Sequence, residues 1–186
     1  MIRESVITTI SAAGQLHIAP IGLIADGEHW IIAPFHPSAT LDNLRAIPEA
    51  VANHVTDVRI IAGCLTGRRD WPTTPSRHIR PPRLAAALTH EELRVIDADD
   101  DPQRPRFRCR VVHREMHAPF LGFNRAQAAV VEAAILTSRL FMLPRDKIER
   151  EIAYLQIAID KTAGTEEQEA WAWLMQRIEA HDRSSR

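Results

Sequence analysis

Short hydroxyl and amide side chains gather around one brief helical pattern early in the chain. Ser38 and Thr40 stand at the start of the pattern TLDNLRAI, Asn43 lies within it, and Pro48 ends it. A helix N-terminus offers unpaired N–H groups and a partial positive charge, and hydroxyls and amides add short hydrogen-bond donors. These residue types at this spacing could bind a phosphate. The alternative is structural: Ser38 or Thr40 caps the helix and Asn43 satisfies a turn.

Other polar residues flank this pattern. Asn53 ends a run of alanine and valine, where a buried amide must pair either with the backbone or with the edge of a heterocycle. His17 and His36 are each either a structural histidine or an acid or base. Asp57 is expected to cap a following helix, with a ligand role second. The candidate ligand site therefore lies between residues 17 and 57.

A second group of polar residues is cationic. Arg125 lies in the first turn of a long apolar helix that Asn124 is expected to cap. A positive side chain is unfavourable at a helix N-terminus, so one interpretation is that Arg125 binds an anionic ligand. The alternative is that Arg125 forms an exposed ion pair within the protein. Further arginines could screen an anionic ligand, although a solvated loop is the simpler interpretation. They are Arg68, Arg69, Arg77, Arg80 and Arg83.

Several kinds of chemistry find no support in the sequence. Cys64 and Cys109 lie in separate predicted elements, so we expect two buried thiols and neither a disulfide framework nor a zinc site. The nine histidines are scattered without an HExxH pair, and no metal site is expected. GxSxG, P-loop and GxGxxG motifs are absent, which argues against acyl transfer and nucleoside triphosphate chemistry.

Size and charge narrow the class of protein. A chain of 186 residues and 21.0 kDa is expected to form one domain with room for an appendage. The formal net charge of -1, from 23 basic and 24 acidic residues, argues against nucleic acid as a partner. There is no apolar run near 18 residues and no charged-then-apolar leader. We therefore expect a soluble, cytoplasmic protein with no membrane partner.

The N-terminal two thirds of the chain has the pattern of an antiparallel sheet. Gly14 and Asp26-Gly27 mark turns between the first strands. Pro20 lacks a backbone donor, which makes its strand an edge or a bulge and leaves the backbone of Ala19, Ile21 and Gly22 free to bond elsewhere. Residues 68–82 are expected to be an irregular surface loop that could act as a lid. The expected strands are 2–10, 15–25, 29–34, 49–55, 93–98 and 106–115.

The remaining elements are helical. Two short helices are expected at 40–47 and 58–65, the second closed by Gly67. The chain then ends in a helical tail of about 60 residues, and residues 181–186 are expected to fray. The helices of the tail are expected at 124–142, 144–164 and 165–180.

The order of these segments resembles a known family. The succession ESVITTI, HIAPIG, a hairpin, PFHPSATLDNL, AVANHVTD and PFLGFNRAQAAVVEAAIL is similar to a branch of the FMN-binding split-barrel superfamily. That branch occurs in methanogenic archaea and methylotrophic bacteria and is catalogued as a domain of unknown function. The superfamily also holds flavin reductases and pyridoxamine phosphate oxidase-like proteins. The resemblance spans residues 2–58 and 117–143, with a compatible helical tail.

The resemblance implies an α+β fold. A six-stranded antiparallel, Greek-key-like split barrel would occupy residues 1–122. A helical extension, residues 123–186, would pack on the barrel or on the partner subunit. The protein would be a homodimer with FMN near the subunit interface.

The resemblance also places the cofactor. The FMN phosphate would lie by Ser38, Thr40 and Asn43. Just before this segment relatives have Arg-Pro-Phe, whereas this chain has Ala33-Pro34-Phe35. Because position 33 lacks an arginine, Arg125 or an arginine of the partner subunit would substitute for it. The resemblance implies further FMN contacts along the second strand, at the turn after the fourth strand and at the start of the long helix. These contacts are His17, Ala19, Pro20, Ile21, Asn53, Asp57, Val58 and Asn124.

Three functional interpretations remain open at this point. The leading one is a flavin-dependent oxidoreductase or reductase, using NAD(P)H or a small redox substrate and linked to one-carbon metabolism. The flavin itself would carry the hydride, so no catalytic residue is named. The alternative is a non-catalytic FMN-binding or storage module whose helical tail docks a partner. A scaffold that has lost the cofactor is the third, and only the missing arginine supports it.

Overall fold

The computed structural model describes residues 1–184 of the chain, which divides into two compact units. One unit comprises Met1–Val55 and Trp71–Phe120, and the other comprises Thr56–Asp70 and Leu121–Arg186. The expected division at residue 122 placed residues 56–70 with the barrel, whereas these residues cluster with the helical unit. None of the helices within residues 1–184 is both long and apolar enough to cross a membrane.

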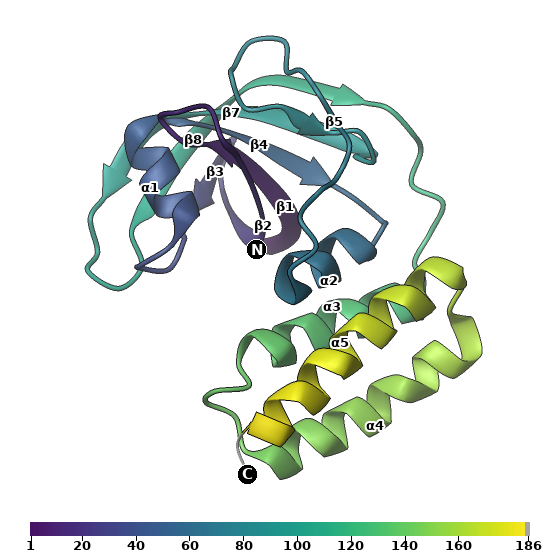
Figure 1. The fold of residues 1–186 in the computed structure, drawn as a ribbon. Helices are drawn as coiled ribbons and strands as arrows, with labels where there is room; N and C mark the ends of the chain where they lie inside the picture. Colours follow the sequence, from purple (N-terminus) through teal and green to yellow (C-terminus); the bar gives the residue numbers. More distant parts are fainter. Residues whose placement is uncertain (185–186) are drawn as a thin grey trace. The chain divides into compact units, whose positions relative to one another are not determined.

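The first unit is a closed barrel of six antiparallel strands, which confirms the predicted fold (Figure 1). Its strand order is β1-β2-β3-β8-β7-β4, so consecutive strands form hairpins except where β4 returns to lie beside β1. That crossover is what a Greek-key-like barrel requires. The strands are β1 Ile2–Ile10, β2 Leu16–Asp26, β3 His29–Ile32, β4 Glu49–His54, β7 Thr89–Asp99 and β8 Arg106–Met116.

β2 is paired unevenly along its length. It pairs with β1 from Leu16 to Ile24 but with β3 only from Ile24 to Asp26. Among the described residues, the first part of β2 therefore has a strand neighbour on one side alone, as Pro20 predicted. The turns on either side of β2 contain Gly14 and Gly27, whose positive φ angles of 79° and 61° fit the predicted hairpins.

The barrel interior is apolar and one short helix packs against it. Leu23, Ile32 and Leu93 are fully buried in this core. Helix α1 (Ala39–Ala46) adds Leu41 and Leu44, which are also buried. Each such side chain contributes roughly 1.5–3 kcal/mol on leaving water. The apolar face of α1 therefore fixes the position of its N-terminus on the barrel.

The outer face of the barrel carries a covering hairpin, residues 73–84. It consists of β5 (Thr73–Thr74), β6 (Arg83–Leu84) and the loop between them. This differs from the irregular loop expected over 68–82. The strands are only two residues long, so neither the alternation nor the turn signals of a hairpin are visible in the sequence.

The second unit is a helical bundle in which α2 packs on α3 and α5, and α3 packs on α4 and α5 (Figure 1). Apolar side chains such as Val130, Ile159 and Leu174 are buried in it. Helix α5 continues to Ser184, so the fraying expected from residue 181 is wrong as far as residue 184, and residues 185–186 lie outside the described residues. The helices are α2 Arg59–Thr66, α3 Arg125–Ser138, α4 Arg145–Thr162 and α5 Thr165–Ser184.

Candidate functional site

The N-terminus of α1 has the chemistry of an anion site. Ser38 is its N-cap, and the Ser38 hydroxyl accepts a hydrogen bond from the Leu41 amide at 3.3 Å. Among residues 1–184, the backbone amides of Ala39 and Thr40 have no hydrogen-bond partner. Ser38 is half-buried and Ala39 is exposed, so the Ser38 hydroxyl and the Ala39 amide are accessible to a ligand. Neutral donors at a helix N-terminus suit a phosphate.

The other two predicted phosphate contacts are less accessible. Thr40 is only 3% exposed and Asn43 only 6%. The Asn43 Nδ2 atom donates to the Thr9 hydroxyl at 2.9 Å, which ties α1 to β1. The structure thus gives Asn43 a role in holding the helix in place.

Arg104 is a cation near this segment that the sequence did not single out. Its Nε atom donates to the carbonyl of Ala33 at 3.1 Å, and its guanidinium lies 5.0 Å from the ring centroid of Phe35. The amide of His36 bonds to the carbonyl of Gln103, which holds the two segments together. Arg104 is therefore placed beside position 33, where the resemblance described above implies an arginine. About 70 residues separate the two segments in sequence, so only the fold reveals this proximity.

Four predicted contacts lie on β2 beside its open edge. His17, Ala19, Pro20 and Ile21 are all half-buried. Their register on β1 runs from Thr9 opposite His17 to Ser5 opposite Ile21. They form a continuous strand segment on the same unit as α1, and the barrel thus brings the β2 and α1 groups onto one scaffold.

Asn53 is used entirely within the barrel. It is 0% exposed, and its Nδ2 atom donates to the carbonyls of Val6 and Val51 and contacts the Thr8 hydroxyl. Its Oδ1 atom accepts from the Leu84 amide at 2.7 Å. Of the two alternatives for this amide, the structure supports backbone pairing. The predicted heterocycle contact would require these bonds to break.

The remaining predicted contacts belong to the helical unit. Asp57 accepts from the backbone amide and side chain of Arg59, so it stabilises the start of α2 although Val58, which is buried, is the formal N-cap. Asn124 caps α3 as predicted and also bonds the Thr162 carbonyl. Arg125 is exposed. A cofactor role for these four residues stays a prediction.

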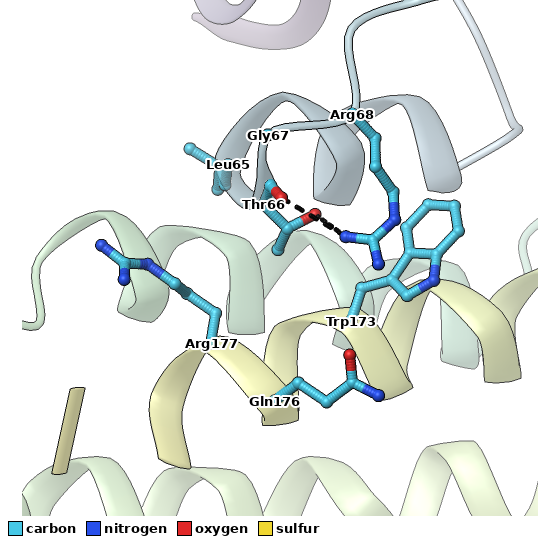
Figure 2. A pocket seen from close by; sticks show the side chains of 7 residues that line it. All are labelled: Leu65, Thr66, Gly67, Arg68, Trp173, Gln176 and Arg177. Atoms are coloured by element: carbon cyan, nitrogen blue, oxygen red, sulfur yellow. Dashed lines mark hydrogen bonds between the residues drawn. The ribbon is translucent and has the colours of Figure 1, made fainter. Parts of the chain in front are cut away.

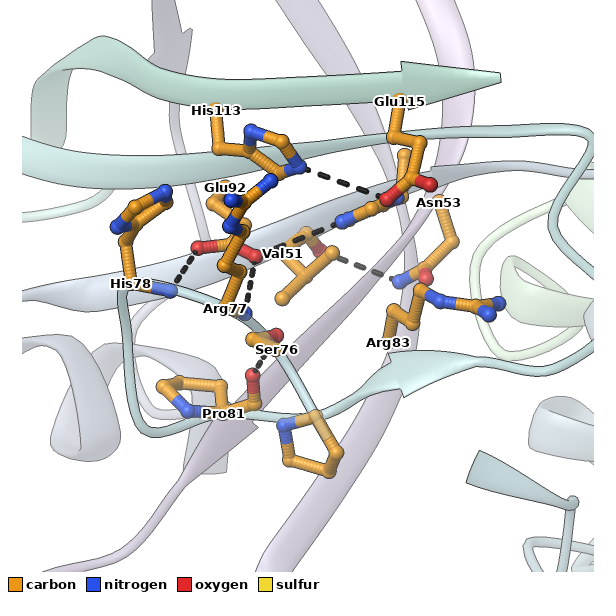
Figure 3. Close-up of polar contacts among 12 residues, drawn as sticks. Val51, Asn53, Ser76, Arg77, His78, Pro81, Arg83, Glu92, His113 and Glu115 are labelled. Carbon is orange, nitrogen blue, oxygen red and sulfur yellow. Dashed lines mark hydrogen bonds and ion pairs between the residues drawn. The ribbon is translucent and has the colours of Figure 1, made fainter. Parts of the chain in front are cut away.

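A line of polar side chains on the outer face of the barrel holds the covering hairpin (Figure 3). The two carboxylate oxygens of Glu92 accept from the amides of Arg77 and His78 at 2.6 and 2.7 Å. Glu49 accepts from the Arg80 amide, Arg94 donates to the His78 carbonyl and Thr8 donates to the Pro82 carbonyl. With the Asn53–Leu84 bond, every one of these contacts is made to the main chain of the hairpin.

Two His-x-Glu sequences meet beneath this hairpin. His90 and Glu92 on β7 face Glu115 and His113 on β8, because the antiparallel register pairs each histidine with a glutamate. His90 Nε2 lies 3.5 Å from Glu92 Oε1, and His113 Nε2 lies 3.5 Å from Glu115 Oε2. His90 Nδ1 also lies 2.8 Å from Nε2 of His117, with the two rings stacked.

Burial sets the charge states in this cluster. Burial lowers the pKa of His90 and outweighs the nearby glutamate, so His90 is neutral near pH 7. Burial acts to raise the pKa of Glu92, but the two hairpin amides and His90 outweigh it, and the net shift is downward. The His113 imidazole lowers the pKa of Glu115. The cluster therefore combines neutral imidazole with ionised carboxylate.

This cluster was not predictable from the sequence because its residues come from two stretches, 90–92 and 113–117, that meet only when β7 and β8 pair. Residues 84–92 have no clear alternation, and only 93–98 were expected as a strand, whereas β7 begins at Thr89. The sequence T-H-E-E is polar, which normally indicates a segment exposed to solvent. In this fold the covering hairpin lies over the outer face of that strand, so the polar side chains on that face are buried. The pairing of β7 with β8 brings together histidines that are scattered along the sequence, and the absence of a metal site stays a prediction.

The surface has two pockets with mainly polar linings. One of about 400 Å³ lies on the barrel and is lined by His78, Arg94 and Arg110 together with part of β8. The other, of about 350 Å³, belongs to the helical unit, where the guanidinium of Arg68 lies 4.3 Å above the Trp173 ring (Figure 2). Arg177 lines the same hollow. Both are open, and the only candidate residue from the sequence that lines either of them is Arg68.

The two cysteines are buried, as predicted. Burial raises the pKa of Cys64 to about 11 and that of Cys109 to about 12. Both therefore stay protonated near neutral pH, and thiolate nucleophilic chemistry is not available to them.

The fold and this set of residues define a class of protein. The closed six-stranded barrel with a separate helical unit is the fold that the resemblance to the FMN-binding split-barrel superfamily implied. The chain belongs to the family described as protein of unknown function (DUF447). The model of the family's N-terminal domain matches residues 3–118, and a second model of the family matches residues 124–176.

Solved structures share this fold. The FMN-bound protein MM1853 from Methanosarcina mazei, of the same family, has a TM-score of 0.81 at 18% identity, over 95% of this chain and 94% of that one. The 2-nitrobenzoate 2-nitroreductase NbaA from Pseudomonas fluorescens has a TM-score of 0.54 at 20% identity, covering 61% and 64%. BorF, the flavin reductase component of a bacterial two-component tryptophan halogenase, has a TM-score of 0.54 at 14% identity, covering 64% and 82%. No protein among those with curated functions matches this sequence.

Proposed function

We propose that this protein binds FMN and acts as a flavin-dependent oxidoreductase. The observation that carries the proposal is the similarity to the FMN-bound protein from Methanosarcina mazei, which extends over 95% of this chain and so includes both units. The flavin reductase and nitroreductase with the same barrel support redox chemistry as the use of the cofactor.

The residues of the barrel fit a flavin mononucleotide. The exposed amide of Ala39 and the hydroxyl of Ser38 would hold the phosphate, and Arg104 would supply the positive charge that position 33 lacks. The open edge of β2 would present backbone groups to the ring system. Bound FMN would supply hydride or single-electron transfer, so the chain itself need only bind, orient and shield it.

A substitution at the helix cap tests the phosphate assignment. Ser38→Asp keeps a good N-cap and suits the helix dipole, so stability should hold, but its charge would repel a phosphate. We expect FMN affinity to fall by about tenfold or more, and Arg104→Gln to weaken FMN binding in the same direction, by fluorescence-quenching titration.

Riboflavin is the matched control, because it has the same ring system without the phosphate. Both variants should bind riboflavin as the wild type does. Equal losses for FMN and riboflavin would place the phosphate elsewhere, and a wild type that binds neither flavin would overturn the proposed function.

Turnover separates the two uses of a flavin site. An oxidoreductase would oxidise NAD(P)H in the presence of FMN, whereas a storage module would bind FMN without turnover. The homodimer, the NAD(P)H donor and the link to one-carbon metabolism are parts of this proposal that rest on the family resemblance.

A further inference from the structure

The cluster on β7 and β8 contains three potential ligands of one metal ion. One ring nitrogen of His90, one of His113 and one carboxylate oxygen of Glu115 all lie within 4.8 Å of one another. The strand register holds the three side chains on the same face of the sheet, because His90 is directly opposite Glu115 and His113 is two residues before it. Figure 3 shows His113 and Glu115 turned toward each other.

The protein leaves one buried polar atom of this group unsatisfied. Nε2 of His113 is buried and has no hydrogen-bond partner among the described residues. Its distance of 3.5 Å to Glu115 Oε2 exceeds the 2.7–3.2 Å of an ordinary N–H···O bond. Ligands of a tetrahedral ion with bonds of about 2.0 Å lie roughly 3.3 Å apart. The observed spacing therefore suits two atoms that share a cation better than two that share a proton.

We propose that His90, His113 and Glu115 bind a divalent transition-metal ion, with Zn²⁺ as the reference case. Two imidazole nitrogens and one carboxylate oxygen form a donor set that such ions take in proteins, and three protein ligands leave a position for water or a substrate. Glu115 has a side chain that is 57% exposed, so the site has an entrance from solvent.

The surroundings support an ordered site. Glu92 is held by two hairpin amides and keeps Oε1 3.5 Å from His90 Nε2, which is longer than an ordinary hydrogen bond, so it acts on the orientation of this imidazole through its charge. A carboxylate that orients a ligating histidine is the usual arrangement around protein-bound metals. Glu92 would act as a positioning residue, since both of its oxygens already accept hydrogen bonds.

Metal titration of the full-length protein tests the site. After treatment with a chelator, the protein would be titrated with Zn²⁺ by calorimetry and with Co²⁺ by its visible ligand-field absorption. We expect saturation at one ion per chain. Glu115→Gln and His113→Ala should each lower the affinity by about 10- to 100-fold or more and remove the Co²⁺ band.

Matched control variants separate the loss of a metal ligand from a nonspecific effect of the substitution. Glu28→Gln and His36→Ala make the same chemical changes at exposed positions outside the cluster and should bind the ion as the wild type does. Glu115→Gln alters an exposed side chain, so its fold should persist, and circular dichroism would verify this. A wild type without saturable binding, or cluster variants that bind as well as the controls, would overturn the proposal. Neither titration involves a flavin, so this proposal and the proposed function can fail separately.

Discussion

Asn53 illustrates how much one buried amide can do at the scale of a residue. It joins β1, β4 and the covering hairpin through both of its polar groups. The sequence predicted that an amide in an Ala/Val strand must find partners. It could not choose between backbone and ligand, because the partner in the hairpin lies 31 residues away and belongs to a strand of two residues.

Asn53→Ala should destabilise the barrel. The change leaves the Leu84 amide and the Val6 carbonyl without these partners in a region closed to water, and each unsatisfied group costs about 1–3 kcal/mol. We expect the free energy of unfolding in urea to fall by about 2–4 kcal/mol. Ser138→Ala, at an exposed residue of α3, is the comparison. A loss below about 0.5 kcal/mol would mean that the hairpin amide finds another acceptor.

At the scale of elements, apolar periodicity located most strands and helices, and local capping chemistry located their ends. Ser38, Asn124 and Gly67 are found at the predicted helix boundaries. The start of β7 and the covering hairpin were not predictable in this way. Their residues are polar because the hairpin is held by hydrogen bonds, and polar residues on a strand otherwise indicate exposure to solvent.

Gly67 offers a test of how α2 ends. Its φ of 87° is in the left-handed region, and a β-carbon there would meet no atom within 4 Å. Gly67→Ala should therefore cost about 1–2 kcal/mol of unfolding free energy through backbone strain alone. Gly67→Asn should cost less, because asparagine tolerates this conformation. Equal costs, measured by loss of helical circular dichroism in urea, would indicate a clash instead of strain.

At the scale of the whole molecule, apolar side chains are exposed along the segment that follows β8. Met116 is 72% exposed, Phe120 55%, Leu121 94% and Phe123 99%. Four exposed apolar residues of this size within one segment of eight residues are unusual on a monomer and are typical of an interface. This surface agrees with the homodimer that the family resemblance implies, and a single sequence could not reveal it because residues 116–123 have no secondary-structure periodicity.

Sedimentation equilibrium should therefore give about twice the chain mass of 21.0 kDa. Leu121→Ser should weaken the dimer by about tenfold or more, since burying a leucine is worth about 1.5–3 kcal/mol. Tyr154→Ser, at a residue of α4 that is 75% exposed, is the matched control and should leave the mass unchanged. A wild type that sediments as a monomer at all concentrations would contradict the dimer.

The way in which the covering hairpin is attached determines which amino-acid substitutions it tolerates. The barrel holds it through main-chain atoms of residues 77–84, which every amino acid possesses. The exposed side chains of Arg77, His78 and Arg80 can therefore be varied or randomised in a library while the attachment persists, whereas Ile79 and Leu84 are buried and must stay apolar. Proline at positions 77, 78, 80 and 84 is the exception, because it removes the amide that the barrel holds. The segment next to the histidine cluster is thus the part of the barrel best suited to acquire new specificity without refolding.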